Sequence, residues 1–166
     1  YYDNTNGNLK YVRAADVTGT TWATPATIDA STSIGGEYTS LQVVNGNPAI
    51  SYYAAGILKY IRATNIAGTT WATPITVDAV VGTGQYTSLQ IVNGNPAISY
   101  YDVFNGNLKY VRASNLSGTA WGAPVSIDVT GTVGQFTSLQ IINGNPAVSY
   151  YNGTNGNLKY VRASDV

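Results

Sequence analysis

The sequence predicts an all-β protein, a β-propeller of four-stranded antiparallel blades with about three blades in the chain. One observation behind this is a repeat, because the block Leu-Lys-Tyr begins at positions 9, 58, 108 and 158. Trp22, Trp71 and Trp121 follow the same interval. An interval of 49 or 50 residues is typical of propellers and solenoids. The abundance of Tyr, Thr, Asn and Gly also favours strands and tight turns over helices.

Each repeat contains four predicted strands joined by turns. In one complete unit they are expected at residues 86–92, 96–101, 108–113 and 121–128. Asn93-Gly94 joins the first two strands, since both central residues of a type I′ hairpin turn need positive φ. Pro96 fits the first residue of a strand, where its missing N–H is tolerated. Three hairpins in succession make an antiparallel meander.

Both faces of the second strand carry bulky side chains. Ile98 and Tyr100 alternate with Ala97 and Tyr101, so neither face is polar. A sheet with two apolar faces lies between neighbouring sheets. Small sheets stacked around an axis are the blades of a propeller. A β-trefoil, which also has three repeats of four strands, is the alternative fold.

The loop before each tryptophan carries a family resemblance. Residues 114–121 read Ser-Asn-Leu-Ser-Gly-Thr-Ala-Trp. This resembles the Asp-box of sialidase-type propellers, a Ser-x-Asp-x-Gly-x-Thr-Trp hairpin between the third and fourth strands of a blade. The Gly and Trp positions match, whereas the acidic or amide residue lies one place earlier. The resemblance implies a structural role for six loop residues: Gly19, Trp22, Gly68, Trp71, Gly118 and Trp121. Stacking of a ligand on the tryptophans is the alternative.

The predicted organisation is a single repeat domain over residues 1–166. It divides into a partial blade at 1–29, blades at 37–78 and 86–128, and a partial blade at 136–166. Closed propellers typically have four to eight blades, so we expect two copies of the chain to assemble into a six-bladed ring. A window cut from a longer tandem chain is the alternative. The strands also have a loose likeness to fucose-binding propeller lectins, which implies a homo-oligomer.

Loop lengths vary on one side of the expected sheets. Tyr101 and Leu108 are seven residues apart, whereas Tyr53 and Leu58 are five apart. Variable loops on a fixed scaffold are common places for binding sites, so we expect a binding face here. Its candidate residues are Lys10, Asp29, Glu37, Tyr38, Lys59, Asp78, Tyr86, Asp102, Lys109 and Asp128.

Lysines and aspartates of this face are expected to meet within each hairpin. The expected pairs are Lys10 with Asp29, Lys59 with Asp78, and Lys109 with Asp128. An exposed ion pair of this kind contributes roughly 0–1 kcal/mol. The more specific alternative is that the carboxylate, lysine and tyrosine together bind a sugar.

The composition argues against an enzyme. The chain has no His and no Cys, and Glu37 is its only glutamate. The arginine cluster of a sialidase is not expected either, because the four arginines are equivalent copies in the repeat. We expect no catalytic residue, metal or cofactor. Because the net charge is zero, we also expect neither nucleic acid nor membrane as a partner.

Two functional hypotheses follow from these observations. The first is a non-catalytic structural or protein-binding scaffold that self-assembles, as a natural fragment or an engineered product of blade amplification. The second is a multivalent lectin with weak, equivalent sites that gain strength by avidity. The composition is typical of secreted bacterial proteins, so an extracellular or cell-surface location is expected.

Overall fold

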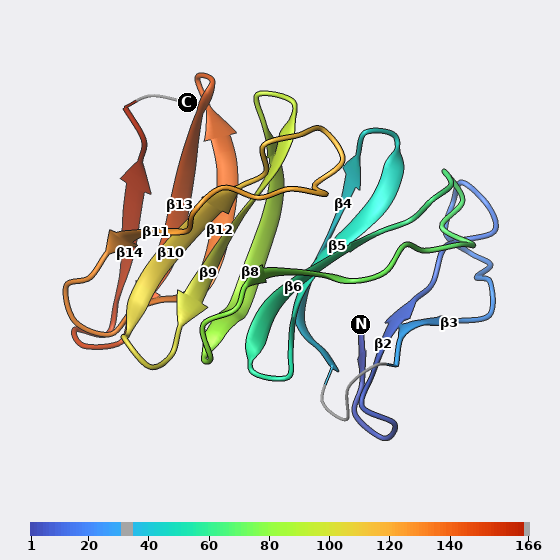
Figure 1. Cartoon of the computed structure of the whole chain (residues 1–166), viewed down its shortest axis with the longest axis horizontal. Helices are drawn as coiled ribbons and strands as arrows, with labels where there is room; N and C mark the ends of the chain where they lie inside the picture. Colours follow the sequence, from blue (N-terminus) through green and yellow to red (C-terminus); the bar gives the residue numbers. More distant parts are fainter. Residues whose placement is uncertain (31–34, 165–166) are drawn as a thin grey trace.

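A computed structural model describes residues 1–30 and 35–164, and these residues form four antiparallel sheets (Figure 1). The first sheet contains β1 (Tyr2–Asp3), β2 (Asn8–Tyr11) and β3 (Ala26–Asp29). The second contains β4 (Gly35–Val44), β5 (Asn47–Ala54), β6 (Ile57–Arg62) and β7 (Ile75–Asp78). The third contains β8 (Thr83–Val92), β9 (Asn95–Asp102), β10 (Asn107–Arg112) and β11 (Val125–Asp128). The fourth contains β12 (Val133–Ile142), β13 (Asn145–Asn152) and β14 (Asn157–Arg162).

The prediction of an all-β fold made of antiparallel meanders is confirmed. Strands are hydrogen-bonded in chain order within every sheet. No helix occurs in the ranges 1–30 and 35–164, and so none there is long and apolar enough to cross a membrane. The sheets follow one another in a row, with the two termini in opposite end sheets (Figure 1). This propeller-like arrangement differs from a β-trefoil because each repeat makes a sheet of its own.

The core lies between successive sheets. Leu58 and Tyr60 of the second sheet are buried in one cluster with Leu89 and Ile98 of the third. Equivalent clusters join the third sheet to the fourth and the first to the second. Each sheet therefore has a forward face, which packs on the following sheet, and a back face, which packs on the preceding one. This two-sided burial is what the sequence pattern of the second strands predicts.

The tight turns predicted from Asn-Gly are also confirmed. Asn45, Asn93 and Asn143 have φ values of 45°, 47° and 49°. The glycine after each of them has a φ of 83°, 81° or 81°. Two successive residues with positive φ are the requirement of a type I′ turn, which matches the twist of the two joined strands.

Strand lengths differ from the prediction at both edges of the sheet. The fourth strand was expected from residue 121, but β11 begins at Val125, and Trp121 makes only an isolated bridge with Ala113. Pro124 precedes the strand, and its missing N–H cannot join a ladder. At the other edge β8 begins at Thr83, before the expected residue 86, because it continues through a bulge. In the first sheet, β1 adds a short strand to the expected pair.

A glycine sets the spacing between sheets. At Gly84 an added Cβ would lie 2.7 Å from the Cα of Leu58 in the preceding sheet, and the φ there is +105°. Gly36 and Gly134 occupy the same position against Leu9 and Leu108. A side chain at these positions would push neighbouring sheets apart, so the absence of a Cβ permits the close packing.

Candidate functional site

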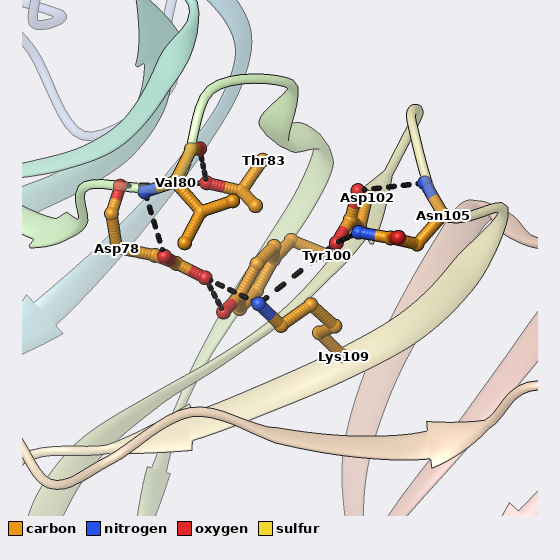
Figure 2. A network of polar contacts seen from close by, with 7 residues as sticks. All are labelled: Asp78, Val80, Thr83, Tyr100, Asp102, Asn105 and Lys109. Carbon is orange, nitrogen blue, oxygen red and sulfur yellow. Dashed lines mark hydrogen bonds and ion pairs between the residues drawn. The ribbon is translucent and has the colours of Figure 1, made fainter.

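A polar contact joins each sheet to the next. Between the second and third sheets, Asp78 at the end of β7 accepts a hydrogen bond from the Tyr100 hydroxyl at 2.7 Å (Figure 2). The Lys109 ammonium donates to the same carboxylate oxygen, also at 2.7 Å. The backbone N–H of Val80 donates to the other oxygen at 3.1 Å. Asp78 and Tyr100 are almost fully removed from solvent and the Lys109 side chain is 11% exposed, so we call this largely buried group the inter-sheet triad.

The triad recurs along the row of sheets. Asp128 accepts hydrogen bonds from the Tyr150 hydroxyl at 2.6 Å and from Lys159, both in the fourth sheet. Asp29 accepts a hydrogen bond from the Tyr52 hydroxyl of the second sheet at 2.7 Å. The carboxylate always comes from the last strand of one sheet, and the tyrosine from the second strand of the next sheet. The triad therefore links successive repeats.

The expected pairing of lysine and aspartate within a hairpin is wrong. Lys109 contacts Asp78 of the preceding sheet, and Lys10 lies 3.6 Å from Asp3. The reason is the alternation of strand faces. Asp128 stands opposite Leu108 in the ladder, so it shares the forward face with Leu108, whereas Lys109 points to the back face. Lys59 has the matching place on β6, in register with Tyr52 and Thr76.

Hydrogen bonds within the triad shift the pKa values of its members. Burial alone would raise the pKa of Asp128, but the Lys159 and Tyr150 hydrogen bonds outweigh it and hold that pKa at about 2. The pKa of Asp78 is lowered for the same reasons, against its own burial. Burial, followed by the hydrogen bond to Asp78, raises the pKa of the Tyr100 phenol. The aspartates are therefore ionised and the tyrosines neutral at ordinary pH.

A second set of carboxylates belongs to the turns between the second and third strands. Asp102 accepts hydrogen bonds from the backbone and side-chain nitrogens of Asn105, at 3.1 and 2.9 Å. It also lies 4.0 Å from the Lys109 ammonium. Asp3 accepts equivalent bonds from Thr5 and Asn6. Of the candidate residues, Asp78, Asp102 and Lys109 thus form one connected group, which Figure 2 shows.

The Asp-box-like loops are held by their own side chains. In the first copy, the Asp16 carboxylate accepts backbone hydrogen bonds from Thr18, Thr20 and Thr21 at 3.0, 3.1 and 2.7 Å. Asn65 replaces it in the second copy and accepts from the Thr69 backbone at 3.1 Å. Asp16 and Asn65, which lie one position earlier than the acidic residue of the Asp-box, thus close the loop in their respective copies. These contacts are internal to the loop, as a structural role requires.

Each loop tryptophan bonds to the loop glycine that precedes it. The indole nitrogens of Trp22, Trp71 and Trp121 donate to the carbonyls of Gly19, Gly68 and Gly118 at 3.0, 2.8 and 2.8 Å. Two of the indoles also pack edge-on against a tyrosine of the preceding sheet, with Tyr11 and Trp71 centroids 5.1 Å apart and Tyr60 and Trp121 centroids 5.2 Å apart. The tryptophans thus contribute to inter-sheet packing.

A row of aromatic rings runs along the first strands of three successive sheets. The row consists of Tyr38, Tyr86 and Phe136, whose ring centroids are 4.6 and 4.4 Å apart. Each ring also meets a tyrosine of its own sheet, namely Tyr53, Tyr101 or Tyr151, at 6.1 to 6.3 Å. We call the first three residues the aromatic row. Sequence reasoning named Tyr38 and Tyr86 but missed Phe136, although it has the same position in the repeat.

The backbone of the aromatic row has an unusual conformation. Tyr38, Tyr86 and Phe136 have φ values of 52°, 54° and 53°, in the left-handed region. Each is part of a β-bulge, at which the ladder with the second strand shifts register. A left-handed conformation at a bulky residue costs roughly 1–3 kcal/mol and persists where the surroundings hold it.

Threonines of the next sheet hold this strained backbone. The Thr87 hydroxyl donates to the carbonyl of Tyr38 at 2.8 Å, and the Thr137 hydroxyl donates to that of Tyr86 at 2.9 Å. Ser51 and Ser99 in turn donate to these threonine hydroxyls at 2.8 Å. The backbone at Tyr38 and Tyr86 is therefore held by contacts that each repeat makes with the following one.

Polar side chains stand beside the aromatic row. Glu37 precedes Tyr38 in the chain, and the equivalent residues are Gln85 and Gln135. Burial, then the neighbouring Tyr86 and Glu37, raise the pKa of Tyr38. Within the described part of the chain, no group of three or more acidic side chains gathers in a way that could hold a metal ion. The structure thus arranges the candidate residues as a buried triad between sheets and an accessible aromatic row.

A crystal structure of an α-L-arabinofuranosidase from Lactobacillus brevis is similar to this chain, with a TM-score of 0.49 and 12% sequence identity. The similarity covers 78% of this chain and 49% of that one, so this chain spans about half the length of the solved structure. No protein-family model matches the sequence, and no curated protein matches it.

Proposed function

We propose that this protein is a non-catalytic β-propeller scaffold of Asp-box-like repeats, closed into a ring by association with a second copy. The observation that carries the proposal is the asymmetry of burial at the end sheets. Leu9, Leu58 and Leu108 are fully buried by the sheet that follows each of them, whereas Leu158 is 79% exposed. An apolar face of this kind is typical of an interaction surface.

Sharing of strands between the end sheets would cover this exposed surface. Every contact between sheets packs a forward face on a back face, so in a blade built from the fourth sheet of one copy and the first sheet of the other, Leu158 would pack on the back face of the other copy's second sheet, as Leu9 does within one chain. A contact of this head-to-tail kind closes into a ring when the rotation between units allows it. Two copies whose end sheets share strands would make the six-bladed ring.

A hollow beside the fourth sheet supports strand sharing. It has a volume of about 90 Å³, and its lining is mostly apolar and includes Tyr110, Ile127 and Val161. Trp71 packs on Tyr11 and Trp121 on Tyr60, and Tyr110 is the next tyrosine in that series. Trp22 is 61% exposed in the first sheet. In the shared blade, Trp22 of one copy packs against Tyr110 of the other.

The triad supports a non-catalytic role. Asp78 and Lys109 are bonded to each other and buried between sheets, so neither is available to a substrate. Asp128 and Lys159 make the equivalent ion pair between the third and fourth sheets, where their side chains are 10% and 33% exposed. Charged groups of the predicted face thus serve assembly of the sheets. We also propose an extracellular location, and this part of the proposal rests on the amino-acid composition alone.

The molecular mass in solution tests the assembly. We expect sedimentation equilibrium to give the mass of two chains, and the change Leu158→Asp to reduce it to one. Ile66 is a 76% exposed apolar residue in a loop of the second sheet, outside the proposed shared blade, so Ile66→Asp is the matched control and should stay dimeric. A wild-type protein that stays monomeric at high concentration would overturn the closed ring.

Carbohydrate binding is the second candidate function, and the aromatic row favours it. Exposed aromatic rings suit sugars, which have apolar faces and polar edges. A glycan array tests this function separately from the mass measurement, because binding to immobilised sugars does not require a closed ring.

A further inference from the structure

The aromatic row lines an open hollow. Its walls are Tyr38, Thr39, Tyr86, Thr87, Phe136 and Thr137, and it is a shallow, open hollow of about 280 Å³. Three successive sheets contribute one aromatic residue and one threonine each. The hollow is therefore built by the repeat itself, with rings and hydroxyls alternating along the chain.

The strained backbone under the rings is not explained by burial. Phe136 is 64% exposed and Tyr38 is 37% exposed, while Tyr86 between them is partly buried, so none of the three rings is buried in the core. Asn and Gly adopt positive φ far more readily than an aromatic residue does. The chain nevertheless places an aromatic side chain there in three repeats. The rings contact one another at the surface, and strain that is kept at such an accessible position indicates a functional role.

The chemistry of the hollow selects the type of ligand. None of its six lining residues is charged, and Glu37 is the charged residue next to them in the chain. A phosphate or a polyanion would find no cationic partner in this lining. A ligand with an apolar face and a hydroxylated edge fits both the rings and the neighbouring polar groups. A pyranose has this character, because its axial C–H bonds cover a face and its hydroxyls lie around the rim.

Neighbouring side chains provide the polar contacts. Glu37, Gln85 and Gln135 each precede one ring of the row. Burial, then Asp102 and Tyr86, raise the pKa of the Tyr101 phenol, and Gln135 is near enough to lower it, which places an amide beside the aromatic row. Carboxylate and amide groups can accept and donate hydrogen bonds to sugar hydroxyls.

We propose that the aromatic row binds a neutral oligosaccharide, with pyranose faces packed on Tyr38, Tyr86 and Phe136 and hydroxyls directed to Glu37, Gln85 and Gln135. This inference rests on carbohydrate binding as the function and is independent of ring closure. One ligand would span several repeats, because the centroids of successive rings are only 4.6 and 4.4 Å apart.

The test is calorimetric titration of the whole chain with three neutral hexasaccharides: cellohexaose, laminarihexaose and mannohexaose. A hexamer of galacturonic acid and a hexaproline peptide serve as the anionic and peptide comparisons. We expect at least one neutral hexasaccharide to bind and both comparison ligands to fail. Binding of none of the neutral sugars would overturn the proposal, as would binding of hexaproline alone.

A variant at Phe136 distinguishes a role of the ring in ligand binding from a role in stability. Phe136→Asn removes a ring while keeping a residue that tolerates φ near 53°. We expect binding to weaken about tenfold or more and the melting temperature to stay level or rise. Ile66→Ala removes a 76% exposed apolar side chain from a distant loop and should leave binding unchanged.

The opposite result for Phe136→Asn, a lower melting temperature with full binding, would make the row a purely structural feature. The mass of each sample is measured in parallel. A monomer that binds sugar contradicts ring closure alone, whereas a dimer that binds no sugar contradicts only the role of the aromatic row.

Discussion

The Tyr100 hydroxyl donates a hydrogen bond of 2.7 Å to Asp78, and the two residues belong to different sheets. Asp78 is the last residue of β7, and Tyr100 lies in β9 of the next repeat. Lys109 joins the same carboxylate from the neighbouring strand. A buried carboxylate with two donors from the following sheet makes each repeat dependent on the next one for its polar contacts.

Removing the Asp78 carboxylate should destabilise the protein strongly. Asp78→Ala leaves the buried Lys109 ammonium with only the more distant Asp102, at 4.0 Å. Breaking a buried ion pair by removing one partner costs about 3 kcal/mol or more. Chemical denaturation should show this loss, and Tyr100→Phe should show a smaller one, since Lys109 then keeps Asp78. Equal losses for the two variants would contradict the central role of the ion pair.

Adding a methyl group at Gly84 should weaken contact between the second and third sheets. The new Cβ would lie 2.7 Å from the Cα of Leu58, at a φ of +105°. Gly46→Ala is the control, because Gly46 also has positive φ but nothing lies within 4 Å of an added Cβ. Both variants incur a backbone penalty of roughly 1 kcal/mol or more. Only Gly84→Ala adds the clash, so its thermal midpoint should fall further than that of the control.

Stability should fall in acid through the triad aspartates. The pKa of Asp128 is lowered from 3.8 to about 2 in the folded protein. When the pKa of a carboxyl is lower in the folded protein than in the unfolded chain, the ionised group stabilises the fold. This stabilisation is fully present when the pH is above the unfolded-state pKa, and it is lost as the pH falls through the folded-state pKa. The thermal midpoint should therefore decrease from about pH 4 towards pH 2. Asp128→Asn should flatten this part of the profile, and an unchanged slope would remove Asp128 as a cause.

The loop tryptophans should differ in what they stabilise. Trp71→Ala removes an indole packed on Tyr11, so unfolding should become easier by about 3 kcal/mol. Trp22→Ala removes a largely exposed indole, so the stability of one chain should change little. Under the proposed ring closure it should instead weaken association, which sedimentation at several concentrations detects. A large loss of monomer stability for Trp22→Ala would contradict this division of roles.

Local features of the fold could be predicted from the sequence because short-range chemistry determines them. The Asn-Gly turns adopt the backbone that their positive φ values require. The Asp-box-like loops close on their own side chains at Asp16 and Asn65. The predicted first residues of two strands were less accurate. Strand β11 begins after Pro124, later than expected, and β8 begins earlier than expected because it continues through a bulge at Tyr86.

The candidate site was predicted only in part. Asp78, Asp102 and Lys109 do lie together, and Tyr38 lies against Tyr86. The expected partners were nevertheless wrong, because pairing within one hairpin ignores which face a side chain occupies. Asp128 shares the forward face with Leu108, so its donors come from the next repeat. The sequence interval alone could have added Phe136 to the candidates.

The sequence by itself determined the repeat, the strands, the turns and the two apolar faces, because each depends on residues within a few positions of one another. Tertiary structure alone decided that Asp78 meets Tyr100 and Lys109, and that Tyr38, Tyr86 and Phe136 form a row. These contacts join residues of different repeats. They depend on how closely one sheet stacks on the next, which the close approach of Gly84 to Leu58 sets.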